Sequence, residues 1–538
     1  MSSAERWIKM TELFLGLDLS TQQLKGVLIG EQLEVVKEES VHFDNELPEF
    51  GTQGGACVNT DASGASRVTV PVLLWVKALD LLLQKLQRSE LPMHKILAIS
   101  GSGQQHGSVY WQTGAEGTLS RFNPFKTLNE QCSNLFSVPN APIWMDSTTT
   151  TQCRRLESSV GGPEVLAHVT GSRAYERFTG PQIAKINEEN PSAYENTERI
   201  SLVSSFLASL LAGKYVPIDW ADGSGMNLMD IRRKHWDPSC LAACAPDLKK
   251  RLQNPVASWS VVGNIGQYFC QRYGFASSCK IVACTGDNPS SVAGMELHTG
   301  DILISLGTSD TVSAIVSNPK PALEGHILCS PLMEDQYIAM LCFKNGSLMR
   351  EKIMGENTNG TWAEFEHKLS QQPAGNAGVI GLYYDQVEIV PSVQGRFYFD
   401  VDDNPMERLE SEQEIRALIE GQSIAKRYHA ESFGFKVTPE TRIYVTGGGS
   451  RNSTLLQVIA NVFQADVYTQ SMTNSAAYGA AYRAAHGLRG GNFYQMIKNS
   501  TGFPPSTLAV KYNKNCKEIY DKMVARYGTI LQKITKKE

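Results

Sequence analysis

The chain has 538 residues, of which 42% are hydrophobic and 20% are charged, and its formal net charge is −5. A chain of this length exceeds what one hydrophobic core normally supports, so we expect an ordinary globular protein with two large domains. The mild negative charge provides no general attraction for nucleic acid or for an anionic membrane, so any phosphate ligand would have to be bound by local groups.

Residues 14–29 have the pattern of a β-hairpin, in which two apolar runs are joined by a short polar turn containing Asp18, Ser20 and Thr21. Small hydroxyl residues at such a tip, with Gly16 before them, leave backbone N–H groups able to face a phosphate. The Asp18 carboxylate could hold a magnesium ion directly or through water. Taken alone, the segment describes any β-turn.

Residues 68–86 are the most apolar stretch, but they contain Lys77 and Asp80, and their large apolar residues recur at helical spacing. We therefore predict an amphipathic core helix rather than a membrane span. Residues 1–12 are charged and lack an apolar core of signal-peptide length, so secretion is not expected. Eleven cysteines without a Cys-x-x-Cys pair argue against zinc and against a disulfide framework, and they favour the reducing cytoplasm.

Residues 96–107 and 442–452 each have the pattern of a strand that runs into glycines, and the second segment continues into a predicted helix. A strand, a glycine run such as Gly447 to Gly449 and a helix N-terminus can together bind an anion or a nucleotide, because bare backbone and the helix dipole both face the ligand. Neither segment matches the dinucleotide fingerprint, since His106 and Asn452 replace the third glycine, and the second is not a Walker A loop.

Residues 281–290 contain a short apolar strand that ends in Gly286-Asp287-Asn288-Pro289. A carboxylate displayed at such a turn could accept a proton from a substrate hydroxyl. Taken alone, the pattern favours an aspartate that only hydrogen-bonds its own turn. The hairpin and glycine segments shift the interpretation toward catalysis.

A second hairpin is predicted at residues 301–316, where Leu306-Gly307-Thr308-Ser309 falls on Leu17-Asp18-Leu19-Ser20 of the first. Two hairpins of one design indicate an internal duplication. We therefore predict two α/β domains, residues 1–297 and 298–538, with a ligand cleft between them that closes when both substrates are bound.

Together these segments resemble the FGGY family of carbohydrate kinases, within the larger group that shares the actin and Hsp70 ATPase fold. Several of them narrow the resemblance to members that act on xylulose. The stretches that carry it are residues 103–107, 144–148, 176–183, 219–230, 286–288 and 476–481. Pro289 departs from the commoner pattern, in which small residues follow Gly-Asp-Asn, and it makes the loop stiffer.

The resemblance implies two ribonuclease H-like domains that flank a central cleft, and it assigns roles residue by residue. Asp287 would be the general base and Asp18 the acid linked to Mg²⁺. The sugar would be bound by His106, Arg177, Asp287 and Asn288, with Gln105, Met145 and Asp146 nearby. ATP would be bound by Ser20, Thr21, Gly307, Thr308, Ser309, Gly447, Gly448, Gly449 and Asn452. Trp362 would cover the adenine, although a tryptophan at a helix start equally describes a core residue.

The activity implied is ATP- and Mg²⁺-dependent phosphorylation of a terminal hydroxyl of a small ketose, with D-xylulose as the expected sugar. Glycerol, ribulose and gluconate stay open as substrates, because few side chains determine the choice. A catalytically silent sugar- or nucleotide-binding regulator and an Hsp70-like ATPase are the alternatives from other classes. The expected partners are the sugar and ATP, with no nucleic acid and no membrane, in a monomer or a homodimer.

Overall fold

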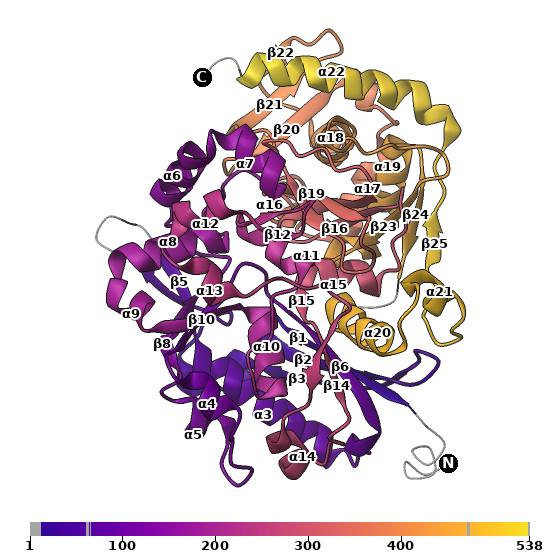
Figure 1. Ribbon diagram of the computed structural model, residues 1–538. Coiled ribbons are helices and arrows are strands. Elements are labelled where there is room, and N and C mark those ends of the chain that lie inside the picture. Colours follow the sequence, from indigo (N-terminus) through magenta and orange to yellow (C-terminus); the bar gives the residue numbers. More distant parts are fainter. Residues whose placement is uncertain (1–11, 61–63, 65, 471–473, 536–538) are drawn as a thin grey trace. The chain divides into compact units, whose positions relative to one another are not determined.

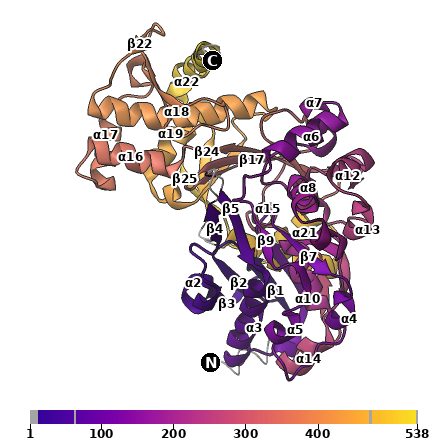
Figure 2. The ribbon, with the colours of Figure 1, turned by 90° about the vertical axis from the view of Figure 1, so that its left-hand side faces the viewer.

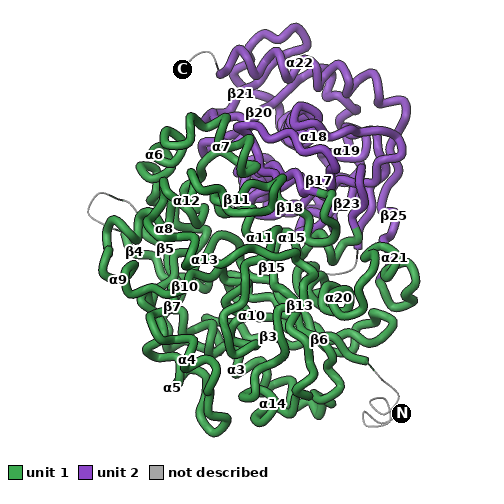
Figure 3. Tube along the Cα trace, in the orientation of Figure 1, with its two compact units in different colours: residues 1–296, 328–336, 474–503 green, residues 297–327, 337–473, 504–538 purple. Residues whose placement is uncertain are grey.

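The computed structural model describes residues 12–60, 64, 66–470 and 474–535, and the chain forms two compact units (Figures 1 and 3). Unit 1 comprises residues 1–296, 328–336 and 474–503, and unit 2 comprises residues 297–327, 337–473 and 504–538. The chain therefore first leaves unit 1 after residue 296 and later returns to it twice. No helix in the described part of the chain is long and apolar enough to span a membrane.

The main sheet of unit 1 has the strand order β13-β14-β6-β1-β2-β3, and β15 pairs with β6. The strands β1, β2 and β3 are antiparallel neighbours, whereas β6 is parallel to β1 and β14 is parallel to β6. Their bounds are β1 Leu13–Leu19, β2 Gln23–Ile29, β3 Val35–His42, β6 Ile96–Gly103, β13 Val261–Asn264, β14 Lys280–Val282 and β15 Thr285–Gly286.

Strand β1 is buried along its whole length because helices cover both faces of this sheet. Helix α3 (Val72–Arg88) packs on β2 and β3, next to which it lies in Figures 1 and 2. On β1 itself, helix α20 (Ser475–Arg489) comes so close that a methyl group on Gly16 would lie 2.2 Å from the Ala477 carbonyl oxygen. A segment late in the sequence therefore completes the core of unit 1.

The predicted helix at residues 68–86 begins later than expected, at Val72, because residues Ser66–Pro71 form strand β5. β-Branched Val68, Thr69 and Val70 favour the extended conformation. Pro71 lacks an N–H and therefore suits the residue that precedes the first helical turn.

The main sheet of unit 2 contains the order β19-β17-β16-β23-β24-β25. Strand β17 is antiparallel to both β19 and β16, whereas β23 is parallel to β16 and β24 is parallel to β23. The bounds are β16 Ile302–Leu306, β17 Asp310–Val316, β19 Tyr337–Phe343, β23 Arg442–Thr446, β24 Asp466–Thr469 and β25 Thr507–Val510. This order and these directions repeat β3-β2-β1-β6-β14 of unit 1, as expected of the duplication inferred from the two hairpins.

Further helices hold the residues discussed below. In unit 1 they are α8 Thr179–Glu189, α10 Val203–Ala212, α11 Trp220–Gly223 and α15 Asp287–Gly294. In unit 2 they are α16 Ser347–Asn357, α17 Trp362–Gln371, α18 Ser411–Ser432, α19 Ser453–Phe463 and α22 Lys517–Thr535.

Candidate active site

Asp287 and Asp18 lie at the same end of the unit 1 sheet. Strand β15 pairs with β6 through Thr285 opposite Ser102, and β1 pairs with the same residue through Asp18. Asp287 follows β15 directly and is the first residue of α15, rather than part of a free turn. The partial positive charge of a helix N-terminus favours a carboxylate at this position.

The environment of Asp287 suits a general base. Burial raises the pKa of its carboxyl to about 7, and the negative charge of Asp18 acts in the same direction. The backbone N–H groups of Asn288 and Gln105 oppose this rise, and the Asn288 N–H lies 2.8 Å from Asp287 Oδ1. A carboxyl with a pKa near neutrality accepts a proton most effectively at the pH of the cell.

Asp18 is almost fully buried, and its Oδ1 accepts a hydrogen bond from Ser102 Oγ at 2.7 Å. Burial raises its pKa, and the Ser102 hydroxyl and the charge of Lys25 oppose that rise. The negative charges of Asp18 and Asp287 repel each other, so a cation nearby would stabilise both carboxylates. No cluster of three or more potential metal ligands occurs among the described residues.

The tip of the first hairpin is fixed by its own side chains. The Ser20 N–H and Ser20 Oγ both donate to the Gln23 carbonyl oxygen at 3.1 Å. The hydroxyl of Thr21 accepts a hydrogen bond from Trp144 Nε1 at 3.0 Å. The turn predicted to bind phosphate is therefore supported by hydrogen bonds on both of its hydroxyl residues.

His106 is a neutral imidazole with a defined tautomer. Nδ1 lies 2.9 Å from the Gly225 carbonyl oxygen, which can only accept, so Nδ1 carries the hydrogen and Nε2 is an acceptor. Burial, assisted by the charge of Arg177, lowers the pKa of His106 to about 3. The ring stacks on Phe178 with 4.3 Å between centroids.

The structure brings four of the predicted sugar-binding residues into two connected pairs. His106 and Arg177 interact electrostatically, and the Arg177 guanidinium lies 5.8 Å from the centre of the Tyr175 ring. Gln105 and Asn288 are joined by a hydrogen bond of 3.0 Å between Gln105 Oε1 and Asn288 Nδ2, although they lie 183 positions apart in the sequence.

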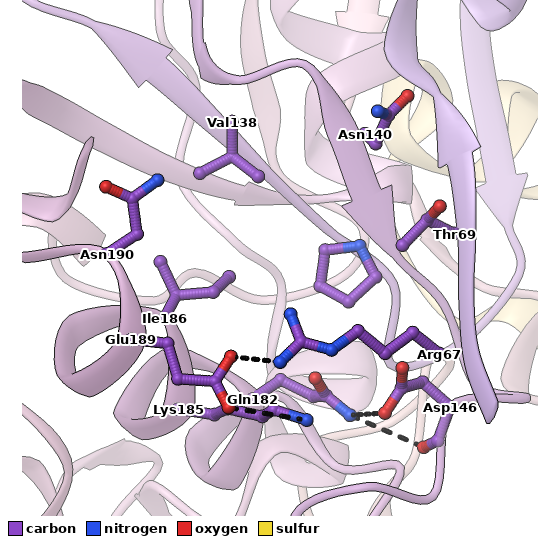
Figure 4. Close-up of a pocket in the computed structure, with 11 residues that line it drawn as sticks. Arg67, Thr69, Val138, Asn140, Asp146, Gln182, Lys185, Ile186, Glu189 and Asn190 are labelled. Carbon is purple, nitrogen blue, oxygen red and sulfur yellow. Dashed lines mark hydrogen bonds and ion pairs between the residues drawn. The ribbon is translucent and has the colours of Figure 1, made fainter. Parts of the chain in front are cut away.

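Asp146 is occupied by donors of its own protein. Its carboxylate accepts hydrogen bonds from Val68 N–H, from Thr148 N–H and Oγ1, and from Gln182 Nε2, at 2.6–3.1 Å. Burial acts to raise its pKa, but these hydrogen bonds outweigh it and lower the pKa. Figure 4 shows Asp146 and Gln182 beside a cavity of about 480 Å³. The adjacent Met145 is 41% exposed.

In unit 2, the second hairpin and the glycine run meet at one end of the sheet. Ser305 pairs with Thr446, so residues Gly307 to Ser309 and Gly447 to Gly449 follow neighbouring parallel strands. Gly447 has φ +82°, and a methyl group there would lie 2.3 Å from the Leu306 carbonyl oxygen. Glycine is therefore required at this position.

The other predicted nucleotide-binding residues stand at helix starts. Asn452 is the N-cap of α19, where its Oδ1 accepts the Leu455 N–H at 2.9 Å. Trp362 is the first residue of α17, and its ring packs edge-on against Phe365 with 5.3 Å between the ring centroids. The residue is 40% exposed, so part of the ring is available to a ligand.

The roles of two buried ionic groups were not predicted from the sequence. Asp310, next to the second hairpin turn, is bound by Arg350 at 2.8 and 3.0 Å and by Lys426 at 2.8 Å. In unit 1, Asp219 accepts a hydrogen bond from Thr285 Oγ1 at 2.7 Å and is stabilised by the charge of Arg483. The first group supports the second hairpin, and the second supports the strand that leads to Asp287.

Comparison with known proteins relates this site to one enzyme family. Residues 133–294 match the N-terminal domain of the FGGY family of carbohydrate kinases, and residues 302–488 match its C-terminal domain. The chain is 52% identical to the xylulose kinase of Rattus norvegicus over 97% of both chains. It is 36% identical to the xylulose kinase of Schizosaccharomyces pombe over 98% of both.

Solved structures share the two-unit α/β fold. A xylulose kinase from Rhodospirillum rubrum, 15% identical, has a TM-score of 0.80 and covers 97% of this chain and 99% of its own. A gluconate kinase from Lactobacillus acidophilus, 18% identical, has a TM-score of 0.76 over 96% and 97%. The fold class expected from the sequence is thereby confirmed.

Proposed function

This chain belongs to the FGGY family of carbohydrate kinases, and we propose that it transfers the γ-phosphoryl group of ATP to the 5-hydroxyl of D-xylulose. The products would be D-xylulose 5-phosphate and ADP. The observation that carries the choice of sugar is the 52% identity to rat xylulose kinase along 97% of both chains.

Asp287 is assigned as the general base. Phosphoryl transfer needs an aligned hydroxyl, neutralised phosphate charge and little covalent chemistry from the protein. In this proposal the Asp287 carboxylate accepts the proton of the sugar hydroxyl as its oxygen bonds to phosphorus. Support comes from the pKa near 7 and from the hydrogen bonds with which Asn288 fixes the carboxylate.

His106 and Arg177 are assigned to the sugar because they offer complementary groups. The His106 tautomer presents an acceptor at Nε2, whereas the Arg177 guanidinium can only donate. A site of this kind discriminates against a sugar that misplaces one hydroxyl, because a buried polar group would then lose its partner.

ATP is assigned to the hairpin turns and the glycine run, with Trp362 against the adenine. These groups provide backbone N–H donors for phosphate and an exposed aromatic face for the base. A bound Mg²⁺ would neutralise phosphate charge, and Asp18 would hold it, directly or through water. We also assign the protein to the cytoplasm, which suits the eleven cysteines, all of them free in the structure.

A coupled assay of ADP release tests this function across D-xylulose, D-ribulose, glycerol and gluconate, with a reaction lacking sugar as the blank. We expect the highest kcat/KM for D-xylulose and a single product phosphorylated at C5 by phosphorus NMR. A higher kcat/KM for another acceptor would reassign the substrate. ADP release that no acceptor stimulates would exclude a kinase acting on these sugars.

A further inference from the structure

Two buried polar atoms beside Asp287 have no hydrogen-bond partner among the described residues. One is Nε2 of Gln105, a donor, and the other is Oδ1 of Asp222, an acceptor; their residues are 3% and 1% exposed. Leaving such a group unpaired costs about 1–3 kcal/mol, so unpaired buried atoms are rare in folded proteins. One atom is a donor and the other is an acceptor, so the two groups are complementary.

Both side chains lie against Gly286, the residue that precedes Asp287. A methyl group on Gly286 would lie 2.5 Å from Gln105 Cγ and 2.8 Å from Asp222 Oδ1. The Gly286 backbone has φ −68°, which any residue can adopt, so the need for glycine here comes from space alone. Burial raises the pKa of Asp222, and the neighbouring Gln105 amide opposes that rise.

The opposite side of the Gln105 amide is connected to the base. Gln105 Oε1 accepts a hydrogen bond from Asn288 Nδ2 at 3.0 Å, and the same nitrogen lies 3.1 Å from Asp287 Oδ1. Because the amide oxygen is committed to Asn288, the amide nitrogen is the group through which Gln105 can bind Asp222.

Asp222 is itself held from behind. Its Oδ2 accepts a hydrogen bond from Ser204 Oγ at 2.5 Å, and its N–H donates to Asp219 Oδ1 at 3.2 Å. Burial and the charge of Asp219 keep the pKa of Asp222 well above its usual value.

We propose that Asp222 is a positioning residue for the general base. Asp222 Oδ1 accepts the Gln105 Nε2–H, Gln105 holds Asn288, and Asn288 orients Asp287. The inference rests on the proposed kinase function and adds a residue to it that never touches the sugar. Asp222 acts by holding this sequence of hydrogen bonds, and no proton is transferred along it.

The test compares kcat and the KM values for D-xylulose and ATP in Asp222→Ala, Asp222→Asn and Gly286→Ala. We expect Asp222→Ala and Gly286→Ala to lower kcat by about 10²-fold, the usual result of misplacing a reacting group by an ångström. The KM for ATP should not change. Asp222→Asn should retain most of the kcat, because its amide keeps an acceptor for Gln105 and can donate to Ser204 Oγ.

A double variant separates positioning from a general structural role. If Asp222 acts only through the base, Asp222→Ala should cause no further loss of kcat in an Asp287→Asn background. Asp80→Asn is the matched control, because Asp80 is another buried carboxyl of unit 1, bound by Tyr268, Tyr273 and the Leu128 N–H. It should lower thermal stability and leave the kcat of the folded protein unchanged.

Three results would overturn the inference while the wild type phosphorylates D-xylulose: a normal kcat in Gly286→Ala and Asp222→Ala, equal losses in Asp222→Asn and Asp222→Ala, or independent losses in the double variant. Should Asp222→Ala fail to fold, the other two variants decide. A normal kcat in Gly286→Ala, or a loss of kcat in Asp222→Asn as large as that in Gly286→Ala, would overturn the inference. A wild type without sugar-dependent ADP release would overturn the proposed function and this inference together.

Discussion

His106 shows how one residue combines an unusual backbone with a defined hydrogen-bonding role. Its φ of +71° lies in the left-handed region, which asparagine tolerates better than most residues. We expect His106→Ala to raise the KM for D-xylulose by roughly 5- to 150-fold, equivalent to about 1–3 kcal/mol for a lost buried hydrogen bond. The KM for ATP should stay close to that of the wild type.

His106→Asn controls for backbone strain in that experiment, because it keeps the left-handed conformation but cannot place an acceptor where Nε2 stands. A raised KM for D-xylulose in both variants would assign the effect to the lost acceptor. A normal KM in His106→Asn would attribute the alanine effect to the backbone and remove His106 from the sugar site.

The pKa of Asp287 predicts the pH dependence of catalysis. A carboxyl whose pKa is raised to about 7 is protonated below that pH and cannot accept the substrate proton. We expect kcat/KM for D-xylulose to fall as the pH drops through about 7, and Asp287→Asn to lower kcat by roughly 10²- to 10⁴-fold with no such dependence. A profile that stays flat down to pH 5 would contradict this assignment.

The same raised pKa predicts the direction of a stability change. The folded state binds the Asp287 proton more tightly than the unfolded state, so this residue makes the free energy of unfolding fall as the pH rises from about 4 to about 7. Thermal unfolding of the ligand-free protein should show that Asp287→Asn loses this contribution. A lower melting temperature for Asp287→Asn at pH 8 than for the wild type would contradict it.

At the scale of the element, the glycine run is held by its close approach to strand β16. Gly447→Ala places a methyl group against the Leu306 carbonyl and requires a strained φ of +82°, so we expect it to lower the melting temperature and raise the KM for ATP. Gly448→Ala is the matched control for stability, because a methyl group there meets no atom within 4 Å. Equal melting temperatures for the two variants would contradict the steric argument.

The elements that could be predicted from the sequence are those with local signals. Both hairpins and both glycine segments follow from apolar alternation and turn residues, which depend on neighbours in the chain. The structure aligns the two hairpins differently from their sequences. The last strand pair before the turn is Leu19 with Leu24 in the first hairpin and Leu306 with Asp310 in the second. Aligning these two pairs makes Ser305, and not Gly307, the counterpart of Asp18. An alignment of the two sequence segments does not reveal that the two turns differ in length.

The site itself was only partly predictable, because several of its contacts join residues that lie far apart in the sequence. Asp287 stood out because a strand ends beside it, whereas the bond between Gln105 and Asn288 depends on the pairing of β15 with β6. Asp222 lies in the stretch 219–230, but its proposed role could not be predicted, since that role depends on its position against Gly286 and on the burial of its carboxyl. Such facts appear only after the sheet is assembled.

At the scale of the whole molecule, unit 1 depends on a segment from the far end of the chain. Helix α20 covers β1 and β6, and its Gly479 lies against α15, where a methyl group would stand 1.8 Å from the Ser290 carbonyl oxygen. We expect a fragment of residues 1–297 to aggregate, because β1 would expose its apolar face. Joining residues 474–503 to it through a flexible linker should restore a cooperative thermal transition. A soluble, cooperatively folding 1–297 fragment would contradict this.

Synthesis on the ribosome proceeds from the N-terminus. Unit 1 therefore cannot complete its fold until helix α20 has been synthesised. The first 296 residues emerge early, but their sheet lacks α20 until residues 297–327 and 337–473 of unit 2 have been translated. At about 5–20 residues per second, this delay is on the order of tens of seconds. A nascent chain would therefore carry an incomplete unit 1 for much of its production, with strands β1 and β6 not yet covered by α20. Premature termination anywhere before residue 475 would leave no active remnant.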